Sequence, residues 1–323
     1  MTGTIVTGAT GFLGGALVRR LLLEGGRVIA VGRNRKILAE LAALGAQPLE
    51  CDLVSGHPPQ IVPGASRLVH CAALSSPWGT RAQFEAANVA GTRCAIELAR
   101  LAGVQRFVHI SSPSIYFRFA DQERVTEDTA LPAPVNAYAE SKARSEYLVL
   151  QEPSLDPVVL RPRGLYGPGD TALLPRLLRT ARERPLPLIR DGVAATDLTF
   201  IDDAVDAILA AMRIQQPPAR IFNVSGGEPV RIQTISEMAA KRAGVDIRWR
   251  RLPWALVHAT ARASEAVCSA LPGRPEPFVT AYGAGLFAFR QTLDLTRAKN
   301  ILGWQPRVSF EEGLERTFAG YAS

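Results

Sequence analysis

Short, largely apolar segments alternate with amphipathic ones along the first half of the chain. The apolar segments lie at 4–7, 28–31, 67–71, 106–110 and 158–160. Between them, apolar residues recur at helical spacing in 16–23, 36–44, 83–102 and 139–150. Strands that are apolar on both faces are typical of parallel sheets covered by helices. The pattern therefore predicts an α/β fold with a doubly wound parallel sheet.

The pattern changes near residue 164, where prolines become frequent and the alternation becomes irregular. We interpret 164–195 together with 225–323 as a smaller, mixed α/β lobe. A helix at 202–212 and a strand at 221–224 are expected to return to the sheet. The larger domain, of the Rossmann type, would then comprise 1–163 together with 196–224.

Composition narrows the class of protein. Of the 323 residues, 47% are apolar and 21% charged, a balance typical of globular enzymes. The net charge is +7, but the basic residues are dispersed, so we expect no nucleic-acid partner. The cysteines and histidines lack metal-ligand spacing, so we expect no metal site. We expect a cytoplasmic protein, because the sequence shows neither a membrane-spanning apolar stretch nor the basic start of a signal peptide.

A glycine-rich loop joins the first predicted strand to the first helix, with the spacing G-x-x-G-x-x-G. Gly8 permits a tight turn, Gly11 lets backbone N–H groups approach a pyrophosphate, and Gly14 lets helix and strand pack closely. The alternative is an ordinary turn with packing glycines. This placement predicts that the larger domain binds a dinucleotide and the lobe the substrate. The predicted loop contacts are Gly8, Thr10, Gly11, Phe12, Leu13 and Gly14.

The end of the second predicted strand indicates which dinucleotide binds. Enzymes that use NAD place an Asp or Glu there to accept hydrogen bonds from the ribose 2′-hydroxyl. Here the run Val31-Gly32-Arg33-Asn34-Arg35-Lys36 contains no acid. Arg33 would pair with a 2′-phosphate, although a solvated arginine is the alternative. We therefore predict that NADP(H) is preferred over NAD(H).

Tyr138 and Lys142 lie one helical turn apart at the start of a predicted helix. A free tyrosine has a pKa near 10, and a neighbouring ammonium group favours its phenolate form. This pairing predicts general acid–base chemistry. Ser111 and Ser112 follow the strand 106–110, upstream of the pair. A serine hydrolase is excluded, because no G-x-S-x-G motif is present.

Motifs along the whole chain carry a resemblance to a known family. They are TGATGFLGG at 7–15, Ser112, YAESK at 138–142, RPRGLYGPGD at 161–170, DLTFIDDA at 197–204, FNVSGGEPV at 222–230 and LGWQPRVSFEEGLERT at 302–317. The chain resembles the extended short-chain dehydrogenase/reductases, which include NAD-dependent epimerases and dehydratases and enzymes like 3β-hydroxysteroid dehydrogenase.

The resemblance implies hydride transfer at nicotinamide C4, with Tyr138 passing the proton. Lys142 would bind the nicotinamide ribose, and Ser112 rather than Ser111 would hold the substrate oxygen. Tyr138 and Lys142 would thus contact the cofactor as well. Without the resemblance, Asn88 would be interpreted as an amide side chain on the surface of a helix, and Asp52 as an acidic residue in a turn. The resemblance implies further cofactor contacts by Asp52, Leu53, Ala72, Ala73, Asn88 and Arg161.

Within the family, the chain resembles the bacterial 2-alkyl-3-oxoalkanoate reductases on Trp78-Gly79, Ser112-Pro113-Ser114 and Arg161-Pro162-Arg163. This implies interconversion of a ketone and a secondary alcohol on a hydrophobic 3-oxo or 3-hydroxy substrate, either a β-keto acid or a sterol-like compound. Apolar residues of the lobe would form either its own core or the lining of a pocket. They are Trp254, Leu256, Val257, Phe278, Tyr282, Leu286, Phe287 and Phe289.

Two other functions stay open. Nucleotide-sugar epimerases, dehydratases and reductases share these motifs, but they commonly grip the diphosphate with an arginine where this chain has Thr196. A non-catalytic dinucleotide sensor is disfavoured, because Ser112, Tyr138 and Lys142 are all present.

The resemblance also bears on partners. The family often dimerises through the helices at about 83–102 and 138–151, so we expect a homodimer. The small side chains of Ala86, Ala87, Ala90 and Ala95 would permit close helix approach, or would pack on the sheet. Contact of 254–271 with a membrane surface is disfavoured against packing within the lobe.

Overall fold

The computed structural model describes residues 3–57 and 64–319, and its centre is a seven-stranded parallel sheet. The strand order is β12-β7-β5-β4-β1-β2-β3, which confirms the predicted doubly wound parallel sheet. The strands are β1 (Gly3–Thr7), β2 (Val28–Gly32), β3 (Gln47–Glu50), β4 (Ala65–His70), β5 (Arg106–Ile110), β7 (Val158–Pro162) and β12 (Ile221–Val224). The sequence did not indicate β3, because this edge strand is mostly exposed and lacks an apolar run.

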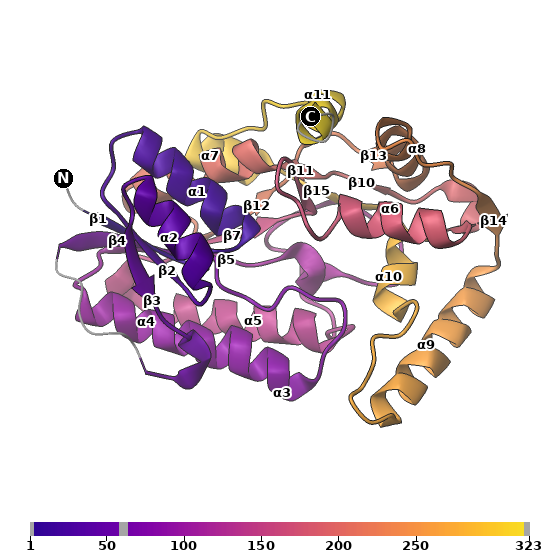
Figure 1. The fold of residues 1–323 in the computed structure, drawn as a ribbon, viewed down its shortest axis with the longest axis horizontal. Coiled ribbons are helices and arrows are strands. Elements are labelled where there is room, and N and C mark those ends of the chain that lie inside the picture. Colours follow the sequence, from indigo (N-terminus) through magenta and orange to yellow (C-terminus); the bar gives the residue numbers. More distant parts are fainter. Residues whose placement is uncertain (1–2, 58–63, 320–323) are drawn as a thin grey trace.

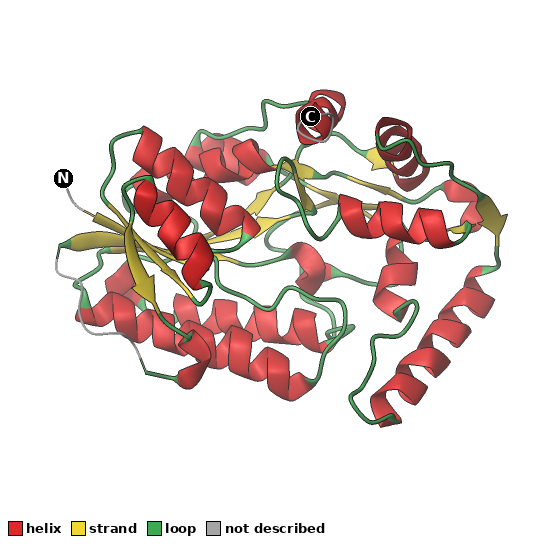
Figure 2. Ribbon diagram, in the orientation of Figure 1, coloured by secondary structure: helices red, strands yellow, loops and turns green. Residues whose placement is uncertain are grey.

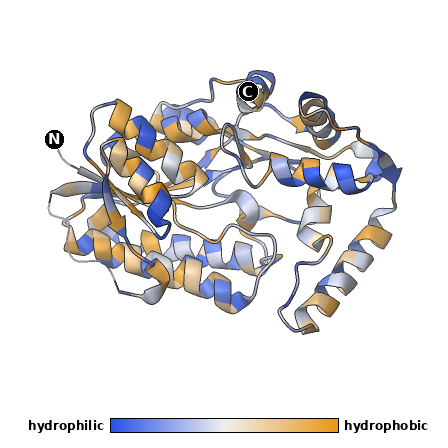
Figure 3. Ribbon diagram, in the orientation of Figure 1, coloured by the Kyte–Doolittle hydropathy of each residue, from blue (hydrophilic) through white to orange (hydrophobic). Residues whose placement is uncertain are grey.

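Helices cover both faces of the sheet (Figures 1 and 2). One face carries α1 (Phe12–Leu23), α2 (Arg35–Ala43) and α7 (Ile201–Arg213). The other carries a helical segment made of α3 (Arg81–Phe84), the π-helical turn Glu85–Ala90 and α4 (Gly91–Leu101), beside α5 (Ala137–Leu150). These helices combine hydrophobic and hydrophilic residues, as expected where only one side meets the sheet (Figure 3).

Successive strand residues supply the two halves of the core. Ile5 of β1 is buried with Phe107 and Leu98 against the α4–α5 layer. The next residue, Val6, is buried with Leu17 and Val205 against the α1–α7 layer. Side chains of neighbouring residues in a strand point to opposite faces, so a parallel strand covered on both sides carries apolar residues at successive positions.

The smaller lobe lies at one end of the sheet and contains a four-stranded sheet, β13-β10-β15-β6. The remaining strands are β6 (Gln122–Val125), β8 (Leu165–Tyr166), β9 (Leu186–Leu188), β10 (Ala195–Thr196), β11 (Thr199–Phe200), β13 (Val230–Arg231), β14 (Trp249–Arg251) and β15 (Gln291–Leu293). The remaining helices are α6 (Leu174–Glu183), α8 (Ile232–Arg242), α9 (Trp254–Ala270), α10 (Ala281–Leu286) and α11 (Phe310–Phe318). The boundaries 1–163 with 196–224, and 164–195 with 225–323, stay a prediction.

Aromatic residues of the lobe form a small core of their own. Trp254, Val257, Phe287 and Phe289 belong to one hydrophobic cluster around Ile189, whereas Leu256 and Phe278 are exposed. The sequence left open whether these side chains would form the core of the lobe or line a pocket. The four clustered residues form part of the core. In the described part of the chain, no helix combines the length and the apolar character needed to cross a membrane.

Candidate active site

The candidate site lies at the carboxyl ends of the parallel strands, where β1 is hydrogen-bonded to β2 on one side and to β4 on the other. The chain leaves β1 toward α1 on one face, and it leaves β4 toward α3 on the other face. Ligands of doubly wound sheets bind at such a switch point. The glycine loop, Tyr138, Lys142 and Ser112 all belong to segments that meet at this edge.

The glycine loop is packed too closely for larger residues. Gly8 has a φ of +67°, and a Cβ atom there would lie 2.6 Å from the backbone nitrogen of Ala72. A Cβ on Gly14 would collide with the carbonyl oxygen of Gly8. These contacts confirm the tight turn and the close helix–strand packing that the sequence predicted for Gly8 and Gly14.

The start of α1 leaves backbone donors available beside this loop. Gly11 is the N-cap residue, and no side chain in the described ranges caps the helix. The first N–H groups of a helix lack partners within it, and the helix dipole favours an anion there. A hollow lined by Thr10, Gly11 and Phe12 on one side, and by Pro168 and Gly169 on the other, borders this helix start. This arrangement fits a pyrophosphate.

Arg33 lies just beyond β2 with a side chain that is 72% exposed. Its Nη1 atom is 3.9 Å from Oδ1 of Asp52, too far for a hydrogen bond. Gly32 leaves room for the side chain of Thr10, because a Cβ atom on residue 32 would lie 2.7 Å from the Cγ2 atom of Thr10. Arg33 is therefore accessible to an anionic ligand, as its predicted role requires.

Asp52 has a structural role in the turn after β3. Its side chain accepts a hydrogen bond of 3.1 Å from the backbone N–H of Val54 and caps the short helix 53–55. Leu53 is buried in that helix. The turn-acid interpretation of Asp52 is thus confirmed, while contacts of Asp52 and Leu53 with the cofactor stay predictions.

Tyr138 and Lys142 occupy the first turns of α5, which Asn136 caps by accepting a 2.8 Å hydrogen bond from the N–H of Ala139. Lys142 is 2% exposed, and its Nζ atom donates a 2.6 Å hydrogen bond to the carbonyl of Ile110 at the end of β5. Burial lowers the pKa of Lys142 to about 8, and the charge of Glu146 partly opposes this. The ammonium group is therefore held at the strand end rather than in solvent.

Ser112 follows β5 and begins the short helix Pro113–Tyr116, which contacts α5. Its Oγ atom accepts a 3.2 Å hydrogen bond from the N–H of Ser114. Ser111 is buried instead, and its Oγ atom has no hydrogen-bond partner among the described residues. The structure therefore places both serines at the strand end beside α5, and the choice of Ser112 stays a prediction.

Asn88 lies in the π-helical turn between α3 and α4 and is 1% exposed. Its amide accepts a 2.7 Å hydrogen bond from the N–H of Leu74 and donates to the carbonyl of Leu74 and the Oγ atom of Ser141. A helix-surface amide is thus the wrong description. Asn88 ties the loop after β4 to the helix that carries Tyr138 and Lys142, and π-helical turns often mark functional sites.

Ala72 and Ala73 begin that loop after β4. Ala72 lies against Gly8, and Ala73 is exposed at the same strand edge. Both lie where the resemblance places cofactor contacts, and those contacts stay predictions.

Arg161 lies at the end of β7 and is fully engaged in a buried network. Its Nε atom donates a 2.9 Å hydrogen bond to Glu146, and its Nη1 atom bonds the hydroxyl of Tyr116. That hydroxyl also donates to Asn223 at 3.1 Å. The network links α5 to β7 and β12 beneath Lys142. Direct cofactor contact by Arg161 stays a prediction, whereas its role in positioning α5 is visible.

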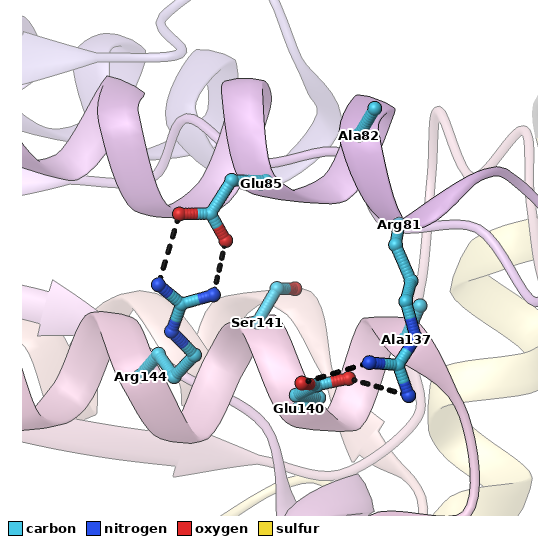
Figure 4. Close-up of a pocket in the computed structure, with 7 residues that line it drawn as sticks. All are labelled: Arg81, Ala82, Glu85, Ala137, Glu140, Ser141 and Arg144. Carbon is cyan, nitrogen blue, oxygen red and sulfur yellow. Dashed lines mark hydrogen bonds and ion pairs between the residues drawn. The ribbon is translucent and has the colours of Figure 1, made fainter.

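Two ion pairs hold α3 and the π-helical turn against α5 on the outer surface. Arg81 lies 3.3 Å from Glu140, and Arg144 forms a bidentate pair with Glu85 (Figure 4). They flank a groove that Ser141 also lines. Exposed ion pairs contribute about 0–1 kcal/mol each to stability. These two pairs therefore link the helices but contribute little to the free energy of unfolding.

Sequence reasoning missed Ser75 and gave Arg163 no role. The Oγ atom of Ser75 lies 3.5 Å from the hydroxyl of Tyr138. Arg163 is 8% exposed just beyond β7, beside Asp197. Tyr282 was named only as an apolar residue of the lobe, yet burial raises the pKa of its hydroxyl to about 12, and the charge of Arg163 partly opposes this rise. The only signal for Ser75 was its place in the loop after β4.

The residues present fit a nicotinamide dinucleotide. The uncapped helix start would hold the pyrophosphate, and the accessible Arg33 would meet the adenosine end. Tyr138 and Lys142 lie at the carboxyl edge, where the reacting end of such a ligand belongs. Within the described ranges, no group of three His, Cys, Asp or Glu residues is placed to hold a metal ion.

Several solved structures and known sequences are similar to this chain. The UDP-glucose 4-epimerase from Thermotoga maritima has a TM-score of 0.74 at 24% identity, covering 99% of this chain and 98% of that one. This likeness concerns the fold. An uncharacterised protein of Escherichia coli K12, YbjS, is 35% identical, with 98% of this chain and 96% of the relative covered.

Two relatives have names that describe activities. The 2-alkyl-3-oxoalkanoate reductase of Stenotrophomonas maltophilia is 33% identical, with 99% of each chain covered. The mouse sterol-4-alpha-carboxylate 3-dehydrogenase (decarboxylating) is 28% identical, with 98% of this chain and 90% of the relative covered. The model of the NAD dependent epimerase/dehydratase family matches residues 4–225. This chain therefore belongs to that family, and it is an oxidoreductase of the extended short-chain dehydrogenase/reductase type.

Proposed function

We propose that this protein is an NADP(H)-dependent oxidoreductase that interconverts a ketone and a secondary alcohol on a hydrophobic 3-oxo or 3-hydroxy substrate, a β-keto acid or a sterol-like compound. The observation that carries the proposal is the placement of Tyr138 one helical turn before a buried Lys142, whose ammonium group bonds the carbonyl of Ile110 at the carboxyl edge of the sheet. Proton transfer to or from a substrate oxygen needs such a positioned acid–base group.

Each catalytic residue has a defined task in this proposal. Tyr138 gives a proton to the substrate oxygen during reduction and takes it back during oxidation. Lys142, anchored on the carbonyl of Ile110, holds the nicotinamide ribose. Ser112 holds the substrate oxygen by a hydrogen bond. The bound dinucleotide supplies or accepts the hydride at nicotinamide C4.

The substrate class is supported by the relatives and by the lobe. Three of them are named as a 2-alkyl-3-oxoalkanoate reductase, a farnesyl dihydroquinoline-oxide ketoreductase and a sterol-4-alpha-carboxylate 3-dehydrogenase. All three names describe hydrophobic molecules with an oxygen to be reduced or oxidised. The ring of Phe117, which is buried after the turn that follows β5, packs edge-on against the ring of Tyr282 of α10 at 4.8 Å between centroids, so this junction with the lobe is apolar.

The preference for NADP(H) rests on the chemistry at the end of β2. A carboxylate there would repel a 2′-phosphate, and this position carries Arg33. Because no hydrogen bond within the described residues holds its guanidinium, it is available for a bidentate contact.

Titration with NADPH and NADH, followed by nicotinamide fluorescence, tests the cofactor preference. We expect Arg33→Ala to reduce the ratio of NADPH to NADH affinity at least about tenfold, as expected for loss of a charge-assisted pair. Arg93→Ala, at an exposed position on α4, is the matched control and should keep the ratio of the wild type.

Turnover tests the reaction. We expect NADP⁺-dependent oxidation of a 2-alkyl-3-hydroxy acid, with kcat lowered about 10²- to 10⁴-fold in Tyr138→Phe while NADPH affinity is retained. Tight NADH binding with turnover only on a nucleotide sugar would overturn the proposal and favour an epimerase or a related enzyme.

A further inference from the structure

Arg19 is a cation of α1 whose charged end has no partner among the described residues. Its side chain is exposed, and no hydrogen bond or ion pair within the described ranges engages its guanidinium. The next residue, Arg20, differs in this respect, because its guanidinium donates to Glu24 at 2.8 Å and to Asp206 at 2.9 Å. The two arginines have the same charge and neighbouring places on one helix. As far as the chain is described, only Arg19 keeps its donors available.

The side chain of Arg19 runs back along α1 toward the glycine loop. A Cβ atom on Gly15, one turn earlier, would lie 3.1 Å from Nη1 of Arg19 and 3.3 Å from the carbonyl oxygen of Ala9. Helical side chains lean toward the N-terminus of their helix, so this direction is an ordinary one. Because Gly15 has no side chain, the guanidinium and the backbone of Ala9 approach the same spot. The charged end of Arg19 therefore lies beside the loop that precedes α1.

The same loop packs against the end of β2. The N–H of Ala9 donates a 3.1 Å hydrogen bond to a carbonyl of β2. A Cβ atom on Gly32 would lie 2.7 Å from the Cγ2 atom of Thr10. Arg33 follows Gly32 directly. Ala9 and Thr10 thus lie between the end of β2, which carries Arg33, and the part of α1 that the guanidinium of Arg19 reaches.

The hollow at the start of α1 extends to this place. Besides the residues already named, its lining includes Ala9, Gly15, Arg19 and, from the first turn of α2, Ile37. In doubly wound folds the pyrophosphate lies at the start of the first helix, and the ribose 2′-oxygen of the adenosine lies at the end of the second strand. The hollow therefore has room, beside Arg19, for a group attached to that oxygen.

Carboxylates also line the hollow, namely Glu40 of α2 and Asp202 of α7. Asp202 forms an ion pair with Arg316 at 3.4 Å. Glu40 is exposed, so solvent and salt screen its charge. Among the described groups without an ion pair of their own, Glu40 is thus opposed by Arg19 and, at the end of β2, by Arg33. An anion at this place is favoured.

We propose that Arg19 binds the 2′-phosphate of NADP(H) from the side of α1, while Arg33 binds it from the end of β2. The inference rests on the proposed function and names a second residue that selects the cofactor. Arginine forks pair with phosphate oxygens through charge-assisted hydrogen bonds, and a phosphate has oxygens enough for both forks. NAD(H) carries only a hydroxyl there, so Arg19 gains no comparable partner from it.

Adenosine fragments test the inference without turnover. Calorimetry of the full-length protein with 2′,5′-ADP and with 5′-AMP isolates the 2′-phosphate, the one group in which the two ligands differ. We expect the wild type to bind 2′,5′-ADP at least about 30-fold more tightly, and Arg19→Gln to lower this ratio about 5- to 10-fold. Arg20→Gln removes the same charge from the neighbouring residue. It should change the ratio less than about twofold, because that guanidinium is already paired.

The affinity for 5′-AMP separates recognition of the phosphate from damage to the fold. Arg19 is exposed, so Arg19→Gln should keep the thermal unfolding midpoint and the 5′-AMP affinity of the wild type. An equal loss of affinity for both ligands would give Arg19 a structural role and overturn the inference. Arg19→Lys keeps the charge but loses the planar fork, and its ratio should lie between those of the wild type and Arg19→Gln.

Other outcomes distinguish this inference from the proposed function. A wild type that binds 2′,5′-ADP no better than 5′-AMP would overturn the preference for NADP(H) together with the role of Arg19. If Arg33→Ala abolishes the preference while Arg19→Gln keeps it, the cofactor preference stands and the role of Arg19 is wrong. Equal losses of the ratio in Arg19→Gln and Arg20→Gln would indicate a general positive field along α1 instead of contact, and would also contradict the inference.

Discussion

Lys142 owes its chemical state to its neighbours rather than to its own side chain. It is enclosed between α5 and the end of β5, and burial lowers its pKa from 10.5 to about 8. The same burial holds the ammonium group against the carbonyl of Ile110, away from solvent. The charge of Glu146, one turn further along α5, limits how far this pKa falls.

This pKa predicts how the stability of the cofactor-free protein depends on pH. Between about pH 8 and 10.5 the unfolded chain binds a proton at Lys142 that the folded protein does not. The free energy of unfolding contributed by Lys142 therefore rises with pH across this window, by roughly 3 kcal/mol at most. In Lys142→Met this rise should be absent. Urea unfolding at pH 8 and pH 10.5 should therefore show that the unfolding free energy of the wild type, relative to that of the variant, is larger at pH 10.5 than at pH 8.

Lys36→Met is the control for that comparison, because Lys36 is exposed on α2. Its unfolding free energy should run parallel to that of the wild type over the same pH range. Parallel curves for Lys142→Met as well would contradict the burial of Lys142 in solution.

At the scale of elements, the junction of β1 and α1 depends on Gly14. A Cβ atom there would collide with the carbonyl of Gly8, whereas a Cβ atom on Gly15 would meet only the flexible end of Arg19 at 3.1 Å and the carbonyl of Ala9 at 3.3 Å. Both glycines are buried in the same helical turn. A Cβ atom would meet rigid backbone at Gly14 but mainly a flexible side chain at Gly15. Substituting each glycine with alanine therefore gives a test variant and its control.

We expect Gly14→Ala to lower the free energy of unfolding by about 2 kcal/mol or more and to weaken NADPH binding at least tenfold, because α1 must move away from the loop. Gly15→Ala should change stability by less than about 1 kcal/mol, since alanine also favours the helix. Thermal unfolding and NADPH titration measure both. Equal effects of the two substitutions would refute close packing at Gly14.

At the scale of the whole molecule, α4 and α5 form one outer layer, and we propose that this layer is the interface of a homodimer. Tyr147 of α5 is 64% exposed, and tyrosine is enriched at protein–protein interfaces. Ala95, however, is fully buried on the sheet side, so it belongs to the core rather than to an interface. The sequence left open whether Ala95 would face a second subunit or pack on the sheet, and the structure shows that it packs on the sheet.

We expect Tyr147→Glu to convert the proposed dimer into a monomer, because it buries a charge without a partner in an apolar contact. Light scattering coupled to size-exclusion chromatography gives the mass directly. Leu23→Glu, on α1 in the opposite layer, alters a residue that is 86% exposed and should leave the mass unchanged. A wild type that elutes as a monomer would contradict the proposal.

Most of the fold and part of the site were predictable because their signals are local. Strands covered on both faces carry apolar residues at successive positions, so β1, β2, β4, β5 and β7 were predictable as short, largely apolar runs. The glycine loop and the Tyr138–Lys142 pair each lie within a few residues. The exposed edge strand β3 was not predictable, because it buries too little apolar surface to leave a pattern.

The sequence by itself determined the alternation of strands and helices, the glycine loop between β1 and α1, and the place of Tyr138 and Lys142 one turn apart on α5, since each depends on residues close together in the chain. Only the tertiary structure decided the state of the polar residues whose partners are distant. It buried Asn88 against Ser141, joined Arg161 to Glu146 and paired Arg163 with the buried Asp197. Burial and hydrogen bonding of a polar group depend on which segments pack around it, and no local pattern encodes that.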